Sequence, residues 1–207
     1  MLVVTGPPNS FHDVDEWIKR LRRTRPLSQV IHAVADSLTT AQGDNYRFLG
    51  GELVLLLREA GQHLDALLIL DELLQRYPTD VRSAIGKANI YFYSLNQAEQ
   101  ALTWIDVALG RANRTLFFRR EALGEKARIL LTLGRGEELS DVLEEIMSVQ
   151  IVAGTPDIGR ERDFVDRAPP GFIRKNVLDR YNEFCPKRAG GGSAEEPPPL
   201  GRPDRGR

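Results

Sequence analysis

Residues that build catalytic and metal sites are scarce in this sequence of 207 residues. It contains one cysteine, Cys185, and three histidines, His12, His32 and His63. The histidines lack the i, i+4 spacing that places two metal ligands on one helix face. A single cysteine cannot form a disulfide within the chain, and Cys185 has no neighbouring histidine in the sequence to activate it as a nucleophile. We therefore expect no metal, no cofactor and no enzyme activity.

An excess of charge of one sign is also lacking. The 28 lysines and arginines offset the 29 aspartates and glutamates, so no broad electrostatic field attracts nucleic acid or an anionic membrane. Residues 1–10, MLVVTGPPNS, show neither a basic start nor a long apolar run, and we expect a cytoplasmic protein with no membrane partner. The same stretch lacks the Gly-Lys-Ser/Thr sequence of a phosphate-binding loop.

Apolar side chains at helical spacing, by contrast, are abundant, and 42% of the residues are hydrophobic. The clearest example is residues 59–80, EAGQHLDALLILDELLQRYPTD. Apolar residues recur there every three or four positions and predict a packed helix face, which Leu68 and Ile69 widen. Gly61 and Pro78 mark the helix ends, because glycine tolerates left-handed backbone and proline cannot continue a helix. Residues 46–60 have the same spacing and predict the partner helix of a hairpin.

The hairpin pattern recurs twice further along the chain. The residues that match Gly61, Ala66, Leu70 and Leu73 are, in the second unit, Asn96, Ala101, Ile105 and Ala108, and in the third, Gly134, Leu139, Leu143 and Ile146. Each second helix follows a predicted first helix, within residues 83–95 and residues 120–133. In the second unit Tyr91 and Phe92 compete for one packing position, which leaves the register there open by one residue.

This pattern resembles the tetratricopeptide repeat (TPR), a pair of antiparallel helices that recurs every ~34 residues. The resemblance covers about half of the chain, and no strand pattern competes with it. It implies an all-α fold, a tetratricopeptide-like stack of helical hairpins forming a short α-solenoid with capping helices at its N- and C-terminal ends. An ordinary helical bundle with accidental periodicity has the same apolar spacing and is the alternative fold.

The terminal repeats of a helical stack expose an apolar face that a capping element must cover. We therefore assign the sequence that flanks the repeats as follows. We expect residues 1–9 to form a flexible N-terminus, residues 10–43 an N-terminal helical hairpin, and residues 44–150 three TPR-like repeats. Residues 151–169 are expected to be a linker and residues 170–185 a C-terminal capping helix that covers the last apolar face. Residues 186–207 contain few apolar side chains and are expected to be a disordered tail.

The resemblance also implies where a partner binds. In the family, the first helix of each repeat lines a concave groove that holds a peptide or a helix. The matching positions here are Gly51, Leu55 and Arg58, then Gly86, Ile90 and Tyr93, then Gly124, Arg128 and Leu131. The glycines would let a partner approach closely. The alternative is that several of these residues pack against the adjacent helix.

One groove chemistry of the family, a clamp of lysines and asparagines for the C-terminal carboxylates of chaperone tails, is not expected here. Its positions carry Gly51, Leu55, Glu121 and Glu125, and only Lys87 fits. Acidic side chains repel a carboxylate ligand.

We therefore predict a non-enzymatic protein–protein interaction module, of the adaptor, scaffold or chaperone-like kind, that binds a peptide or an amphipathic segment. The predicted groove residues are Leu55, Arg58, Lys87, Ile90, Tyr93, Arg128 and Leu131. Bacterial secretion chaperones also combine about three such repeats with flanking helices. The sequence names no partner, and it leaves the oligomeric state open, a homodimer included.

Two arginine-rich stretches supply an alternative function. These are residues 19–25, KRLRRTR, and the later group Arg111, Arg114, Arg119 and Arg120. Such groups contact phosphates in nucleic-acid-associated regulatory proteins. Cations near the end of a helix, however, also interact favourably with its dipole. Nucleic acid is therefore the secondary prediction.

Overall fold

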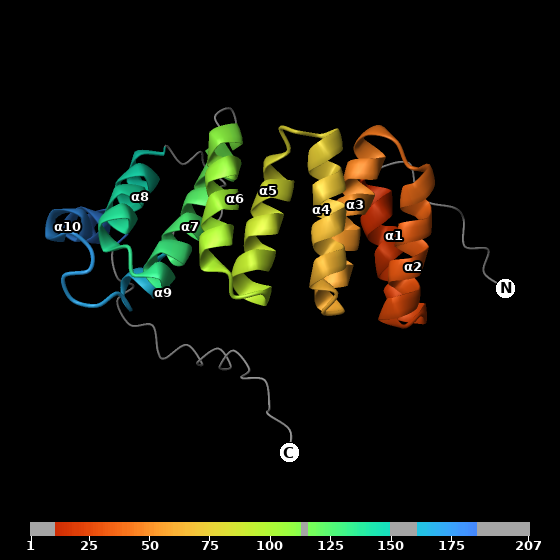
Figure 1. Cartoon of the computed structure of the whole chain (residues 1–207), viewed down its shortest axis with the longest axis horizontal. Coiled ribbons are helices and arrows are strands. Elements are labelled where there is room, and N and C mark those ends of the chain that lie inside the picture. Colours follow the sequence, from red (N-terminus) through yellow and green to blue (C-terminus); the bar gives the residue numbers. More distant parts are fainter. Residues whose placement is uncertain (1–10, 113–115, 150–160, 186–207) are drawn as a thin grey trace, which may run out of the picture.

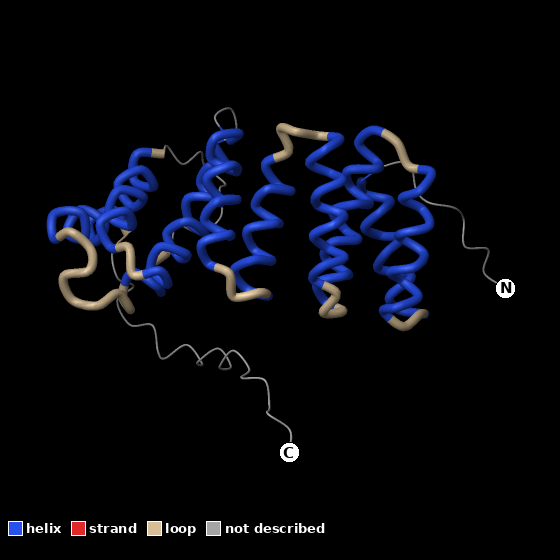
Figure 2. The backbone as a smooth tube through the Cα atoms, viewed as in Figure 1, coloured by secondary structure: helices blue, strands red, loops and turns tan. Residues whose placement is uncertain are grey.

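The computed structural model describes residues 11–112, 116–149 and 161–185. Within these ranges the chain forms helices and connecting turns without a β-strand, and Figures 1 and 2 show the helices side by side in an elongated stack. The elements are α1 (Phe11–Thr24), α2 (Leu27–Thr40), α3 (Gly43–Glu59), α4 (His63–Arg76), α5 (Val81–Asn89), the π-helical turn η1 (Ile90–Ser94), α6 (Ala98–Arg111), α7 (Leu116–Leu133), α8 (Gly136–Ser148), α9 (Arg162–Val165) and α10 (Lys175–Phe184). The all-α prediction is confirmed.

The helices pair in the predicted order. The N-terminal hairpin is α1–α2, and three further hairpins follow it: α3–α4, α5 and η1 with α6, and α7–α8. Each helix from α2 to α8 packs against the next, while α10 packs against α8 at the end of the stack (Figure 1). The expected flexible N-terminus, residues 151–160 of the expected linker, and the expected tail lie outside the described residues.

A left-handed residue ends the first helix of each of the three repeats. Gly61, Asn96 and Gly134 each have a positive φ, of 74°, 53° and 73°. In each case the amide of the following residue bonds back to a carbonyl of the last helical turns, with Gln62 N to Leu57 O at 2.8 Å as one example. This left-handed cap turns the chain into the second helix. The three positions aligned from sequence therefore have one structural role.

Small and apolar residues of the aligned positions make the core. Ala66, Ala101 and Ala108 are 0% exposed, as are Leu139 and Leu143. Buried side chains form two clusters. One spans α1 to α4 and includes Ile90 of η1, and the other extends from Leu74 near the end of α4 to α10. The clusters meet where α4 packs against α5. Alanine lets neighbouring helices approach closely, which explains its place at these contacts.

The second repeat departs from regular helix geometry in its first helix. Leu95 N bonds to Ile90 O at 3.1 Å, an i→i+5 bond that marks a π-helical turn. A π turn inserts one residue into an α-helix and rotates everything after it relative to everything before it. This insertion resolves the open register at Tyr91 and Phe92, both of which are half-buried against the core.

The C-terminal cap is larger than the sequence indicates. Ile173, Val177 and Tyr181 of the expected capping helix are buried. Residues 161–169, which the sequence assigns to a linker, contain α9, whose Phe164 and Val165 are also buried. The stack is therefore closed by two elements, with α9 beside α7 and α10 against α8. None of the described helices is both long and apolar enough to cross a bilayer.

Candidate protein-binding face

The exposed sides of the first helices, α1, α3, α5 with η1, and α7, lie next to one another and are here called the first-helix face. Side-chain interactions connect α1 to α3 and α5 to α7. Arg22 of α1 forms an ion pair with Glu59 of α3. Arg82 of α5 places its guanidinium carbon 5.8 Å from the ring centroid of Phe118 in α7. These contacts join α1 to α3 at one end of the face and α5 to α7 at the other.

Glu52 of α3 stands within this row of helices. Burial raises the pKa of the Glu52 carboxyl, and the negative charge of Asp15 on α1 adds to the increase, while Arg22 and Arg82 oppose it. The charges that influence Glu52 come from α1 and α5, the first helices on either side of α3. Charged residues of α1 and α5 therefore lie near Glu52 of α3.

Leu55 and Tyr93 are the predicted residues that the structure leaves open on this face. The Leu55 residue is 53% exposed and the Tyr93 residue 42% exposed. Gly51 stands one turn before Leu55, and a Cβ atom added there would have no other atom within 4 Å. Leu55 on α3 and Tyr93 on η1 therefore offer apolar surface that a partner can cover.

Tyr93 is held in place by two charged residues of α7. Its hydroxyl donates to Glu125 Oε2 at 2.7 Å and accepts a hydrogen bond from Arg128 Nη1. Arg128 also donates to Glu125 at 3.2 Å. Burial, and next the hydrogen bond to Glu125, raise the pKa of the Tyr93 hydroxyl to about 12. The ring is therefore fixed in its neutral form, with one side open to solvent.

Ile90 does not belong to the face, contrary to the sequence prediction. Its side chain is 0% exposed and packs in the cluster of α1 to α4. Gly86 and Ile90 stand one regular helical turn apart, and both face the preceding unit, since Gly86 packs on Leu70 of α4 and Ile90 packs in the cluster of α1 to α4. The π turn that begins at Ile90 rotates only the residues after it, so Tyr93 points outward while Ile90 points inward.

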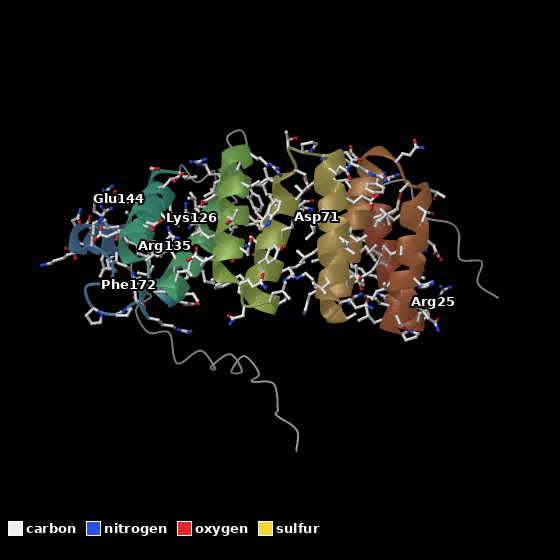
Figure 3. The ribbon with its side chains drawn as sticks, in the orientation of Figure 1. Arg25, Asp71, Lys126, Arg135, Glu144 and Phe172 are labelled. Carbon is white, nitrogen blue, oxygen red and sulfur yellow. The ribbon has the colours of Figure 1, made fainter. Side chains whose placement is uncertain are left out.

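Lys87 is also misplaced by the sequence prediction. The residue is 4% exposed, and its ammonium pairs with Asp71 of α4 and lies 3.9 Å from the ring centroid of Trp104 in α6. Asp71 lies between α4 and α5 in Figure 3. Lys87 thus joins its own helix to the second helices of two units. It is not available to a ligand on the first-helix face.

The remaining predicted residues are only partly accessible. Arg58 and Leu131 are half-buried, and Leu131 packs against the core. A Cβ atom added at Gly86 would lie 3.2 Å from the Leu70 side chain, so Gly86 serves the packing of α5 on α4. At Gly124 the space is taken by Glu161, whose Oε1 would lie 2.9 Å from an added Cβ atom. The predicted residues that remain open therefore belong to the first two repeats, while Phe117 of α7, which was not predicted, is 45% exposed.

Many residues of the arginine-rich stretches are engaged within the chain. Lys19 pairs with Asp15 at 2.6 Å and Arg22 with Glu59. In the second group, Arg119 pairs with Glu145 and Arg120 with Glu161, while Arg114 lies outside the described residues. Charges neutralised by neighbouring carboxylates are poor contacts for a phosphate backbone. The pairing of these four residues reduces the charge that the two stretches offer to a phosphate backbone.

Sequence reasoning misses one exposed apolar pair and misassigns one of its members. Leu64 and Leu68 on α4 are 69% and 66% exposed, although the sequence prediction places Leu68 on the packed face. A signal is present in the sequence, because Leu64 and Leu68 share a helical stripe with Asp71 and lie opposite Ala66. Within the described ranges no group of three or more histidine, cysteine or acidic side chains is arranged to hold a metal ion.

Comparison with known proteins supports the fold. No protein-family model and no curated protein sequence matches the chain. Among solved structures, it resembles a crystal structure of the nearly identical TPR-like repeats of a candidate kinesin light chain from Podosopora anserina. That match has 14% identity and a TM-score of 0.54, covering 86% of this chain and 97% of the other. A crystal structure of a substituted form of those repeats matches at 15% identity, again with a TM-score of 0.54, over 82% and 91%. The chain therefore has a TPR-like helical-repeat fold.

Proposed function

We propose that the protein is a non-enzymatic interaction module whose first-helix face binds a peptide or an amphipathic segment of another protein. The observation that carries the proposal is the exposure of Leu55 and Tyr93 on a face where many charged residues are paired with one another. A partner that covers these two side chains removes apolar surface from water without having to break a strong field of one sign.

The local geometry supports an extended or helical protein segment as the ligand. The space over Gly51 admits close approach beside Leu55. Tyr93 presents a ring whose hydroxyl is already satisfied by Glu125 and Arg128, so its burial by a partner leaves no donor unpaired. Rigid aromatic anchors of this kind contribute strongly to binding because they lose little side-chain entropy. An adaptor or chaperone-like role in the cytoplasm is consistent with this chemistry.

Selection from a random peptide library displayed on phage tests the proposal without requiring that the partner be identified first. Peptides selected on the full chain are measured against Leu55→Glu/Tyr93→Ala and against Leu64→Glu/Leu68→Glu. The second pair is the matched control, because it alters exposed leucines on the second-helix side. We expect the first pair to abolish binding and the control pair to retain it, while circular dichroism of both stays near the parent.

Two outcomes would count against the proposal. One is a selection that yields no peptide with saturable binding. The other is a set of peptides that bind Leu55→Glu/Tyr93→Ala normally and lose affinity for Leu64→Glu/Leu68→Glu. The second result would move the binding surface to α4.

A further inference from the structure

Residues 161–165, sequence ERDFV, lie on the first-helix face of the third repeat. Figure 1 places α9 beside α7. The segment contacts the side of α7 that carries Arg120, Gly124 and Arg128, residues spaced one helical turn apart. A four-residue helix is not stable alone. Its order therefore derives from its contacts with α7 and from Arg162, which donates to Asn182 Oδ1 at 2.7 Å and to Cys185 O at 2.9 Å at the end of α10.

The Glu161 carboxylate is bound by a complementary site on α7. Arg120 Nη1 donates to Oε1 at 2.7 Å, and Nη2 donates to Oε2 at 2.6 Å. The Glu161 side chain is 5% exposed and the Arg120 side chain 15% exposed. Gly124 allows this approach, since a Cβ atom there would lie 2.9 Å from Glu161 Oε1. The bidentate guanidinium of Arg120 and the space left by Gly124 together form a carboxylate-binding site.

An aromatic ring follows the carboxylate at a fixed offset. Phe164 is 8% exposed, and the guanidinium carbon of Arg128 lies 5.7 Å from its ring centroid. The same guanidinium carbon lies 6.0 Å from the Tyr93 ring centroid. Arg128 thus lies between Tyr93, which is exposed, and the part of the face that residues 161–165 cover. A segment lying across Tyr93 meets residues 161–165 at this point.

The buried ion pair is better suited to selecting a ligand than to stabilising a cap. Apolar residues of similar volume often stabilise a protein as well as a buried ion pair does, because both charges lose their hydration. Phe164 and Val165 already supply apolar burial to the end of the stack. Arg120 adds a requirement that any segment bound here carry a negative charge at the position of Glu161. Such a requirement makes binding specific.

We infer that the third-repeat part of the first-helix face is a binding site for a protein segment with a carboxylate followed three residues later by an aromatic ring, and that residues 161–165 fill this site in cis. The inference rests on the proposed function and names its ligand chemistry. A partner that extends over all three repeats must carry the same carboxylate and ring and displace α9. Its apparent affinity is lowered because α9 occupies the site in most molecules.

The test uses a fluorescent, N-acetylated peptide of residues 161–168, ERDFVDRA. The control peptide carries Glu161→Gln and Phe164→Ala. Binding is measured to the full-length parent and to the full-length variant Glu161→Gln/Phe164→Ala, in which α9 lacks the carboxylate and the ring. We expect the variant to bind the peptide at least about tenfold more tightly than the parent. Adding Arg120→Gln to the variant removes the carboxylate site, and we expect binding to fall to the level of the control peptide.

Equal binding of the peptide to parent and folded variant, or equal binding of both peptides to the variant, would overturn the inference. If the variant does not fold, hydrogen exchange on the unaltered chain decides the question. Excess peptide should then accelerate exchange of the amides of α9, and unchanged exchange would contradict displacement. Library-selected peptides that still require Leu55 and Tyr93 while the 161–168 peptide fails would remove only this inference and leave the proposed function intact.

Discussion

Lys87 of α5 forms an ion pair with Asp71 of α4, and the pair joins the first repeat to the second. The next repeat has the same arrangement, with Lys126 of α7 paired to Asp106 of α6 at 2.7 Å. In both cases the lysine on a first helix reaches the second helix of the preceding unit. The Lys87 side chain is 5% exposed, against 21% for Lys126. The two pairs provide a matched test of how burial sets the energy of one contact.

Asp71→Ala is expected to be more damaging than Asp106→Ala. The first change leaves the buried ammonium of Lys87 without its carboxylate and is expected to lower the free energy of unfolding by about 1–3 kcal/mol. The second leaves a lysine that can turn to solvent and is expected to cost less than about 1 kcal/mol. Urea denaturation of the two variants measures the difference. Equal losses would show that burial of Lys87 does not govern this contact.

Gly136→Ala is expected to disturb the C-terminal cap. A Cβ atom at Gly136 would run into the carbonyl oxygen of Phe172, and backbone at this contact cannot move aside as a flexible side chain can. We expect a loss of about 1–3 kcal/mol in unfolding free energy, measured by thermal or urea denaturation. Gly51→Ala is the control, since it meets no atom within 4 Å and should gain roughly 0.5–1 kcal/mol from helix propensity. A neutral Gly136→Ala would mean that the cap is not packed against α8.

Ile90→Glu is expected to unfold the second repeat, whereas Leu55→Glu is not. Ile90 is 0% exposed, and a carboxylate there would be buried without a partner, a change that costs more than about 4 kcal/mol. Leu55 is exposed, so its replacement should alter stability by no more than about 0.5 kcal/mol. Circular dichroism melting compares the two variants. A stable Ile90→Glu would contradict the burial of Ile90 in the core.

Ionisation of Tyr93 is expected to affect stability only in alkali. An unfolded tyrosine has a pKa of about 10, and Tyr93 in the folded chain has a pKa of about 12. As pH rises, the unfolded chain therefore loses this proton first, so the contribution of Tyr93 to stability is complete below about pH 10 and is lost as pH approaches about 12. The difference in tyrosinate absorbance between parent and Tyr93→Phe measures the titration. Ionisation of Tyr93 near pH 10 would contradict its burial against Glu125.

The repeat architecture can be predicted because it depends on local sequence patterns, namely apolar spacing and helix-cap positions. Spacing alone aligns Gly61, Asn96 and Gly134, and all three have the left-handed backbone of a helix cap. Regular periodicity leaves Leu55 outside the packed stripe of α3, and the structure leaves Leu55 exposed.

The errors arise where a residue depends on something other than local spacing. Periodicity does not reveal that Gly86 and Ile90 face the preceding unit, nor that the π turn at Ile90 then rotates Tyr93 away from them. Lys87 looks available to a ligand because its partner Asp71 lies on another helix, and an ion pair between repeats leaves no local mark in the sequence. Glu161 lies in a stretch rich in glycine, proline and charge, and only the fold brings it to Arg120.

The central claim, that the first-helix face binds a protein segment, is tested most directly by photocrosslinking from two exposed leucine positions. A benzophenone amino acid replaces either Leu55 on α3 or Leu68 on α4, which are 53% and 66% exposed. Each protein is irradiated with a library-selected peptide at saturating concentration, and adducts are measured by mass spectrometry. The prediction is a peptide adduct from position 55 and none from position 68. Adducts from position 68 alone, or equal adducts from both positions, would contradict it.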